Sequence, residues 1–301
     1  MIRHVLRPTV IAVAVLLCAG AFVGSAHAAG TTHYVAPPGP TIPFDTSCAF
    51  PGFNSIQAAV TASNPGDTIV VCDGTYAEQV TIGKSLTLAG SGNAIIQAPA
   101  TLVADGSGKK NVVEVNAAAS VTMFGFTVVG PGPGACGSID TGIAVLGGAS
   151  LDLSATTVRD IRDNPLSGCQ NGEGIRVGTP RYSATPDVGH ATIDNVIVTH
   201  YQKNGIVVAG TSSTGKITNT TVTGQGKTPL LAENGIEVVD GAAATISTST
   251  MRDNFYTGAQ KVKACGLLII NANGVNDSNN IYLNDQQNKC TANGRGGTYE
   301  G

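Results

Sequence analysis

A short glycine-led motif that returns about every 31 residues limits the possible folds of this chain more than any other feature. In each copy the glycine is followed by an aliphatic residue, any residue and a second aliphatic residue. Five copies begin at Gly142, Gly174, Gly205, Gly235 and Gly266. A second motif, six residues long with aliphatic ends, occupies 123–128, 153–158, 193–198, 217–222 and 246–251. Each repeat therefore offers two short strands separated by turns rich in Gly, Asn and Asp.

One such repeat cannot be stable alone. Each of its few apolar side chains contributes about 1.5–3 kcal/mol on burial, whereas ordering the backbone costs about 1–2 kcal/mol per residue. Stacking the repeats as turns of a solenoid places equivalent aliphatic residues in continuous interior columns. The two predicted columns are Ile143, Ile175, Ile206, Ile236 and Leu267, and Val145, Val177, Val208, Val238 and Ile269. The repeat therefore predicts an all-β parallel β-helix.

Residues 1–28 have the pattern of a secretory signal peptide. Arg3 and Arg7 precede an apolar run over 10–23, and Ala-His-Ala at 26–28 has the small-x-small pattern that signal peptidase cleaves. The apolar run is short for a membrane-spanning helix, so a membrane anchor is the weaker interpretation. We expect a secreted protein with no stable membrane insertion after cleavage.

Charge and composition argue against several other classes. Loss of Arg3 and Arg7 with the signal peptide changes the formal net charge from −3 to −5, which argues against a nucleic-acid-binding surface. The 39 glycines, the absence of Trp and the 12% of charged residues are typical of a turn-rich β protein and exclude a helical bundle. We expect a monomer with no nucleic-acid partner.

Six cysteines follow the signal peptide. An even number in an exported chain predicts disulfide bonds, and no CxxC or HxxxH spacing indicates a metal site. Cys136 and Cys169 occupy nearly equivalent places on adjacent repeats, so they are expected within bonding reach. A second bridge would fasten the amino-terminal segment to the first strand, and a third follows by elimination. The predicted bridges are Cys136–Cys169, Cys48–Cys72 and Cys265–Cys290.

The segment 54–63 is predicted to be a helix. Ile56, Ala59 and Val60 fall at helical spacing behind a cap at Asn54 or Ser55. The first coil of a solenoid exposes a sheet edge and the end of the apolar core. We therefore expect this helix to cover the first coil.

The stretches SIQAAV, PGDTIVV, DGTYAEQVTI and KSLTLAGSG, within residues 53–97, resemble the amino-terminal coil of right-handed parallel β-helix proteins in the pectin lyase-like superfamily. The resemblance implies a right-handed helix, secretion and a carbohydrate ligand, with a polysaccharide as the expected partner. We divide the chain into a signal peptide (1–28), an N-terminal extension (29–52), the β-helix (53–290) and a flexible C-terminal tail (291–301).

The catalytic motifs of the enzymes in this superfamily have no counterpart here. Missing are the QDT and DFIFG elements of pectin methylesterases, the WIDH and RxPxxR elements of pectate lyases, and the NTD, DD, GHG and RIK elements of polygalacturonases. Two hypotheses stay open. The first is a secreted protein that binds or cleaves an extracellular polysaccharide, with lyase activity as its enzymatic form. The second is a non-catalytic extracellular adhesion or scaffold protein.

Loop lengths predict a notch in the third of these repeats. Seven residues lead from Val198 to Gly205, whereas the equivalent segments of the neighbouring repeats are 16 and 13 residues long. Grooves between loops are common ligand sites on solenoids. Alignment of the coils places Asp160 beside His200, and Lys203 between two glutamates, on the floor of this notch.

Two interpretations of the notch remain open. In the functional one a polysaccharide lies in it, His200 tuned by Asp160 acts as the general base, and Lys203 or Arg159 supplies positive charge. In the structural one Asp160 and His200 cap a turn, and Lys203 forms an exposed ion pair with Glu233 worth under about 1 kcal/mol. The residues predicted to contact the substrate are Arg159, Glu173, Tyr201 and Glu233.

Calcium is the one cofactor that the resemblance suggests, because lyases of this superfamily often use it to neutralise uronate carboxylates. Asp160, Asp163 and Glu173 are close in sequence, but their spacing does not match a dedicated calcium loop. We therefore expect no cofactor, with calcium as the alternative.

Overall fold

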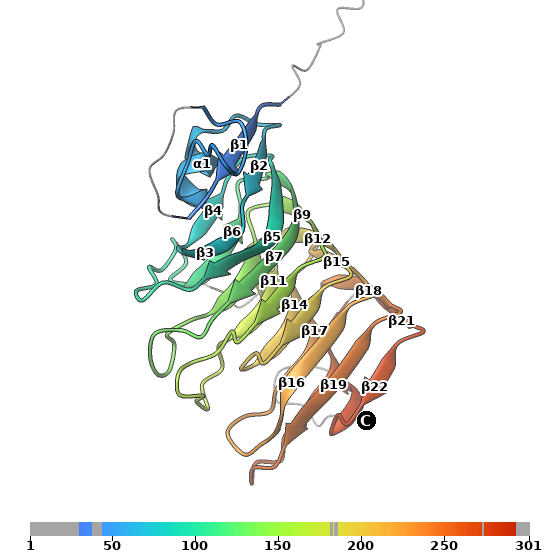
Figure 1. The fold of residues 1–301 in the computed structure, drawn as a ribbon. Coiled ribbons are helices and arrows are strands. Elements are labelled where there is room, and N and C mark those ends of the chain that lie inside the picture. The colour runs from blue at the N-terminus through green and yellow to red at the C-terminus, as the bar shows by residue number, and fades with distance from the viewer. Residues whose placement is uncertain (1–29, 38–43, 181–182, 184–185, 273, 293–301) are drawn as a thin grey trace, which may run out of the picture.

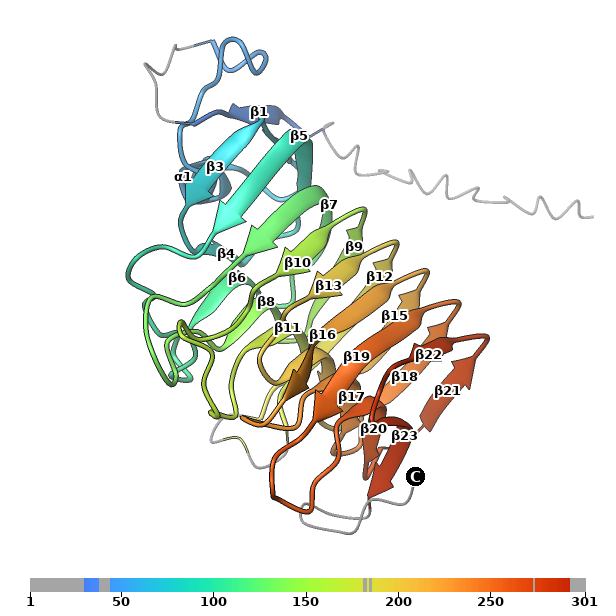
Figure 2. The same ribbon diagram turned by 60° about the horizontal axis from the view of Figure 1, so that its bottom comes forward.

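The computed structural model describes residues 30–37, 44–180, 183, 186–272 and 274–292. These residues form an elongated stack of coils that runs from helix α1 (Ile56–Ala62) to the last coil near the C-terminus (Figures 1 and 2). Neighbouring strands of successive coils pair in parallel throughout the stack. The predicted parallel β-helix is confirmed. No helix in the described ranges is long and apolar enough to cross a membrane.

Each central coil contributes one strand to each of three faces. The first face consists of β9 (Ala149–Ser154), β12 (Gly189–Asp194), β15 (Thr214–Thr218), β18 (Ala243–Ser247) and β21 (Gly274–Ser278). The second face consists of β10 (Thr157–Arg159), β13 (Ile197–Thr199), β16 (Thr221–Thr228), β19 (Thr250–Tyr256) and β22 (Ile281–Leu283). The third face consists of β4 (Val80–Ile82), β6 (Asn111–Val115), β8 (Thr141–Val145), β11 (Glu173–Val177), β14 (Asn204–Ala209), β17 (Asn234–Val239), β20 (Cys265–Ile270) and β23 (Gln287–Ala292).

Longer strands join the first two faces near the N-terminus. Strand β7 (Ser120–Val129) pairs with β9 along its first half and with β10 along its second half. Strand β5 (Thr87–Gln97) pairs with β7 across a register shift, and also with β2 (Thr68–Val71) and β3 (Gly74–Ala77). The first and second faces therefore belong to one continuous hydrogen-bonded sheet, bent at a corner in each later coil.

The interior columns have the register that the repeat predicted. Ile175 on β11 pairs with Ile143 on β8 and with Ile206 on β14, and the same register continues to Ile236 and Leu267. All five of these side chains have no exposed surface. In the second column only Ile269, on β20 in the coil before the last described one, is partly exposed and packs against the core.

Two corners of each coil depend on single residues with left-handed backbone. Between the first and second faces these residues are Ala155, Asn195, Asn219, Thr248 and Asn279, with φ between 43° and 56°. After the second face they are Asp160, His200, Asp253 and Asn284, with φ between 55° and 60°. Asn and Asp tolerate this conformation better than most residues, which explains their frequency at the corners.

Helix α1 covers the N-terminal end of the stack, as predicted. Its buried residues Ile56, Ala59 and Val60 join the main core. Ser55 caps the helix by accepting a hydrogen bond from the Ala58 amide. The Glu78 carboxylate accepts hydrogen bonds from the amides of residues 56 and 57, at 2.8 and 2.9 Å, so it stabilises the positive end of the helix.

The segments flanking the β-helix contribute strands of their own. The expected N-terminal extension, 29–52, supplies β1 (Thr32–Val35), which pairs in parallel with β2. At the other end, residues 291 and 292 of the expected flexible tail belong to β23. The expected signal peptide, 1–28, lies outside the described residues, as does the rest of the tail.

Polar side chains close the C-terminal end of the described stack. Asp277, Tyr282 and Lys289 lie in register with Ile246, Met251 and Leu267 of the preceding coil, which are core residues. Lys289 pairs with the Asp277 carboxylate, and the Tyr282 hydroxyl donates to the same carboxylate at 2.9 Å. We call these three residues the terminal plug.

Three disulfide bonds tie the loops and ends to the stack. The pairs are Cys48–Cys72, Cys136–Cys169 and Cys265–Cys290. All three agree with the prediction. The bridge between Cys136 and Cys169 joins the long loops of adjacent coils, which supports the coil alignment used for the notch.

Candidate functional site

A groove of about 500 Å³ lies on the outer side of the third face, at the predicted notch. The connection from β13 to β14 spans only residues 200–203, whereas the loop 160–172 of the preceding coil and the loop 257–264, two coils further on, are longer. These loops and residues 230–232 wall the groove. Polar side chains line one part of it, and Val207, Val239, Leu268 and Ile270 line the other.

Lys203 is half-buried in the groove. Its Nζ donates a hydrogen bond to the Ala232 carbonyl oxygen at 2.8 Å. Burial lowers the pKa of the Lys203 ammonium. The carboxylates of Glu237, Glu173 and Glu233 oppose this shift, because they favour the charged form. A lysine whose pKa is lowered by burial in a groove is a candidate functional residue.

A hydrogen-bonded network surrounds Lys203. The Asn204 side-chain amide donates to Glu237 Oε2 at 2.7 Å, and the Asn234 amide donates to Asn204 Oδ1 at 2.9 Å. Glu173, only 6% exposed, pairs with Arg176 through Oε1, and its Oε2 has no partner within the described part of the chain. The groove therefore contains oriented donors and acceptors from three adjacent coils.

Three of the four predicted substrate contacts are buried, and two of these, Tyr201 and Glu233, do not line the groove, so this part of the prediction is wrong. Tyr201 has no exposed surface, and its hydroxyl donates to Asn254 Oδ1 at 2.5 Å. The left-handed backbone of His200 turns the chain, so the following side chain points into the core. Glu233 is also fully buried, and both of its carboxylate oxygens accept a hydrogen bond from the backbone amide of Gln225 at 2.9 Å.

A glycine makes room for the Glu233 carboxyl group inside the stack. A Cβ atom at Gly224 would lie 2.9 Å from the Glu233 carboxyl carbon. Burial raises the pKa of Glu233 to about 8, and the negative charges of Asp285 and Asp253 act in the same direction. Lys203 therefore does not form the exposed ion pair with Glu233 that the structural interpretation expected.

His200 and Asp160 are neighbours, as the coil alignment predicted. His200 Nδ1 lies 3.9 Å from Asp160 Oδ1, and both residues occupy left-handed corners. The Asp160 carboxylate pairs more closely with Arg159, at 2.7 Å, and also approaches Arg162 at 3.8 Å. His200 is 55% exposed and does not line the groove. The role of His200 as a general base therefore stays a prediction, because the side chain lies outside the groove.

Several groove residues were missed by the sequence interpretation, and two of them carry a recognisable signal. Arg176 and Glu237 occupy the unspecified position between the two aliphatic residues of the repeat motif. Because strand side chains alternate, that position must face outward when its neighbours face the core. The signal was therefore present in the repeat itself.

The three acidic residues considered for calcium do not converge. Asp163 is fully buried and accepts hydrogen bonds from Ser138, Ser167 and Gln202. Asp160 pairs with arginines, and Glu173 pairs with Arg176. Among the residues that the structure describes, no group of three or more His, Cys, Asp or Glu side chains could hold a metal ion.

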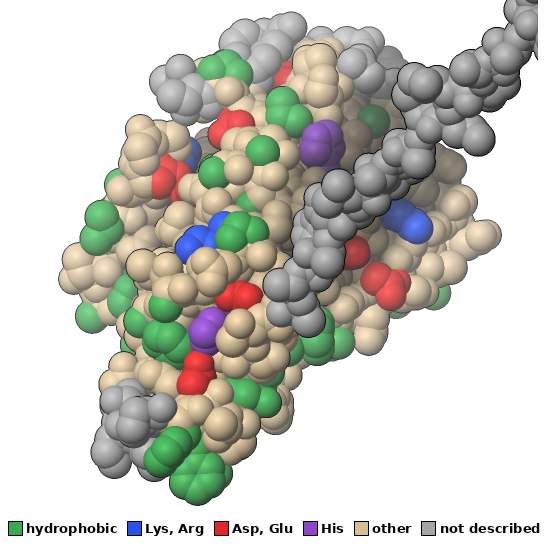
Figure 3. Space-filling model, turned by 90° about the horizontal axis from the view of Figure 1, so that it is seen from above, with side chains coloured by type: hydrophobic (Ala, Val, Ile, Leu, Met, Phe, Trp, Pro, Cys, Tyr) green, Lys and Arg blue, Asp and Glu red, His purple; other side chains and the backbone are tan. Residues whose placement is uncertain are grey.

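Acidic and basic side chains are both present on the face drawn in Figure 3, where they lie among hydrophobic and other side chains. In the groove of the third face, positive charge comes from Lys203, Arg176 and Lys263.

Comparison with known proteins finds structures of similar fold and no match in sequence. No family model matches the chain, and no curated protein matches it in sequence. Among solved structures it is similar to the pectate lyase Pel9A, with a TM-score of 0.55 and 16% identity over 89% of this chain and 79% of that one. A pectin methylesterase from Aspergillus niger is also similar, with a TM-score of 0.47 and 16% identity over 82% of this chain and 87% of that one. For an alginate lyase from a Paenibacillus species the TM-score is 0.43 and the identity 13%, over 77% of this chain and 96% of that one.

The strand pairing and the likeness to the pectate lyase agree on one architecture. The chain has a right-handed parallel β-helix fold similar to that of this pectate lyase, which is the fold that the amino-terminal stretches implied. At this level of identity the likeness concerns the fold, and function has to be argued from the site.

Proposed function

We propose that the protein acts outside the cell on an acidic polysaccharide, which binds in the groove of the third face. The observation that carries this proposal is Lys203, a lysine half-buried in the groove, whose pKa is lowered by burial. Three disulfide bonds support an oxidising, extracellular setting. The pectate lyase of similar fold acts, by its name, on an acidic plant polysaccharide.

The cationic groups of the groove suit a uronate chain. Lys203 and Lys263 lie on the two sides of residues 230–232, and Arg176 lies on the adjacent coil. Lys and Arg both bind carboxylates, and Arg does so with a planar pair of donors.

The proposed reaction is a β-elimination with Lys203 as the base. A neutral Lys203 amine removes the proton on the carbon beside the uronate carboxylate, and the electron pair forms a carbon–carbon double bond. The bond from the next carbon to the glycosidic oxygen breaks, and that oxygen leaves with a proton from water. A lowered pKa increases the fraction of neutral amine near pH 7, which this step requires.

A polysaccharide panel tests this proposal. Polygalacturonate, alginate and methylated pectin would be assayed for binding and for the ultraviolet absorbance of the unsaturated product. We expect Lys203→Ala to abolish product formation and Lys203→Arg to retain binding without turnover, because arginine stays protonated. Lys227→Ala is the matched control, since Lys227 lies over the Phe255 ring outside the groove.

Each outcome separates the hypotheses. Binding without product in the wild-type protein would leave a polysaccharide-binding protein and refute the lyase step. Absence of binding to all three polymers would refute the groove proposal and favour the adhesion or scaffold hypothesis. Equal activity of wild type and Lys203→Ala would exclude Lys203 as the base.

A further inference from the structure

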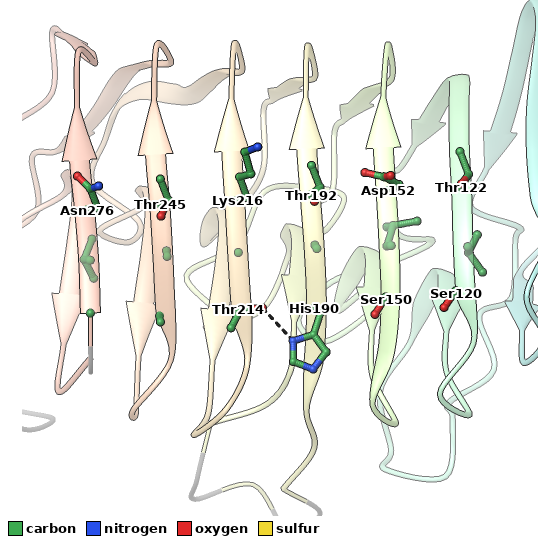
Figure 4. Close-up of a pocket in the computed structure, with 18 residues that line it drawn as sticks. Ser120, Thr122, Ser150, Asp152, His190, Thr192, Thr214, Lys216, Thr245 and Asn276 are labelled. Atoms are coloured by element: carbon green, nitrogen blue, oxygen red, sulfur yellow. Dashed lines mark hydrogen bonds between the residues drawn. The ribbon is translucent and has the colours of Figure 1, made fainter.

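A second and larger groove, of about 770 Å³, lies along the outer side of the first face. Figure 4 shows six adjacent strands, β7, β9, β12, β15, β18 and β21, whose labelled side chains project from one side of the sheet. None of its lining residues belongs to the groove of the third face. This first-face groove is therefore a separate surface.

Two rows of outward side chains cross the six strands in register. The pairing aligns them rung by rung from β7 to β21. One row is Ser120, Ser150, His190, Thr214, Ala243 and Gly274. The other row is Thr122, Asp152, Thr192, Lys216, Thr245 and Asn276. Hydroxyl groups predominate, and Ala243 with Gly274 leaves space at the C-terminal end of the first row.

Most of these polar groups are free to bind a ligand. His190 Nδ1 lies 2.8 Å from Thr214 Oγ1, which fixes the orientation of the imidazole (Figure 4). The hydroxyls of the other serines and threonines in the two rows make no hydrogen bond to any described residue. A row of unpaired hydroxyl, amide and imidazole groups offers both donors and acceptors.

The charges of the groove balance. Asp152 and Lys216 are two rungs apart in the same row, separated by Thr192. At a rung spacing of about 4.8 Å they are about 10 Å apart, too far for an ion pair. Lys216 interacts electrostatically with the Asp194 carboxylate, without a direct ion pair. A groove with one positive and one negative side chain favours a neutral, hydroxyl-rich ligand over a polyanion.

The dimensions and side chains indicate the shape and class of the ligand. Six rungs at about 4.8 Å span about 24 Å, which suits an extended chain of several sugar rings along the stack. Protein interfaces are enriched in aromatic residues, Met and Arg. Neither outward row contains an aromatic residue, Met or Arg, so the groove does not have the composition of a protein interface.

We infer that the first-face groove binds a neutral glycan chain, laid along the axis of the stack, independently of the proposed site on the third face. Each sugar ring would meet the side chains of about one coil, with Asp152 and Lys216 hydrogen-bonded to its hydroxyls near the middle of the groove. Such a surface would hold the protein on a neutral polymer while the other groove engages an acidic one.

Isothermal titration with three neutral hexasaccharides, cellohexaose, mannohexaose and xylohexaose, tests this inference. We expect at least one to bind, with affinity at least tenfold above that of the matching trisaccharide because the groove spans several rings. The double variant Asp152→Ala/Lys216→Ala should weaken hexasaccharide binding at least tenfold. Ala243→Tyr, which fills the groove, should weaken it too, and unchanged melting temperatures would show that both variants are folded.

Lys203→Ala is the control, since it alters only the other groove and should bind the hexasaccharide like the wild type. Failure of all three hexasaccharides to bind would overturn the inference. Unchanged affinity in both groove variants would overturn it too, as would an equal loss of affinity in Lys203→Ala. Preferential binding of polygalacturonate here, lost on removal of Lys216, would refute the neutral class of ligand.

Discussion

Replacement of Glu233 by glutamine should make the protein more stable at neutral and alkaline pH. Glu233 has no exposed surface, and burial raises the pKa of its carboxyl group to about 8 from an ordinary 4.5. Between these two pH values the folded protein keeps the proton, while the unfolded chain releases it. The folded state therefore binds more protons, and stability falls as pH rises through this window.

The expected magnitude follows from the width of the window. Each pH unit between about 4.5 and 8 removes about 1.4 kcal/mol of stability through this one group, or about 3 kcal/mol from pH 5 to pH 7. In Glu233→Gln the side-chain oxygen can still accept the hydrogen bond from the Gln225 amide. The new side-chain NH2 group replaces an acceptor oxygen, and burying it without an acceptor lowers the free energy of unfolding by about 1–3 kcal/mol at every pH. The pH-dependent part should nevertheless disappear.

A second buried carboxyl group, that of Asp285, determines the pH range in which Glu233 can be measured by itself. Burial raises the pKa of Asp285 to about 6, so this group also releases a proton on unfolding at lower pH. Above pH 6.5 both states of Asp285 are largely ionised, and Glu233 dominates the difference. Denaturant unfolding of wild type and variant at pH 6.5, 7, 7.5 and 8 should therefore give stability curves that diverge by about 1.4 kcal/mol per pH unit near pH 6.5 and by about half as much near pH 8, where the folded group is half ionised.

Parallel stability curves for wild type and Glu233→Gln from pH 6.5 to 8 would refute the reasoning. They would show that Glu233 is already ionised in the folded protein, or that water reaches it. Asp152→Asn is the control, because Asp152 is an exposed carboxylate without a described partner. That control should follow the wild-type curve.

Two further predictions concern the core and the loops. Ile206→Asp places a charge in the middle of an interior column and should abolish the cooperative thermal transition. Ile206→Val should lower the free energy of unfolding by only about 0.5–1.5 kcal/mol. A wild-type melting curve for the aspartate variant would contradict the column assignment. Hydrogen bonds from Ser167, Gln202 and other neighbours outweigh burial and lower the pKa of Asp163, so its stabilisation is present above about pH 4 and lost as pH falls through the folded pKa. Asp163→Ala should therefore lower stability by several kcal/mol at pH 7 and less at pH 3 in denaturant titrations, and an equal loss at both pH values would exclude an ionised Asp163.

The repeat made much of the fold predictable. A residue such as Ile175 lies in register with Ile143 because parallel pairing repeats the same geometry in every coil. The same periodicity placed Cys136 and Cys169 within bonding reach. Where the chain repeats, one correct alignment determines many contacts at once.

The site was harder to predict, because it depends on the corners and loops that interrupt the repeat. Alternation of side chains stops at the left-handed residue His200, so Tyr201 enters the core instead of the surface. Glu233 enters the stack because Gly224 leaves a space, and such a space depends on a residue in another part of the coil. Lys203 reached the groove as predicted, but its partner, the Ala232 carbonyl, comes from a loop without a strand pattern.

The terminal plug has a consequence for assembly. The open end of a β-helix is the same kind of surface as the interface between two coils, so a second molecule stacked on it would extend the ladder into a fibre. With Asp277 and Lys289 at core positions of the last described coil, any added coil would have to bury an ion pair against its own apolar column. The desolvation of those charges opposes end-to-end growth. The plug thus makes this end of the described stack a poor surface for the addition of another coil.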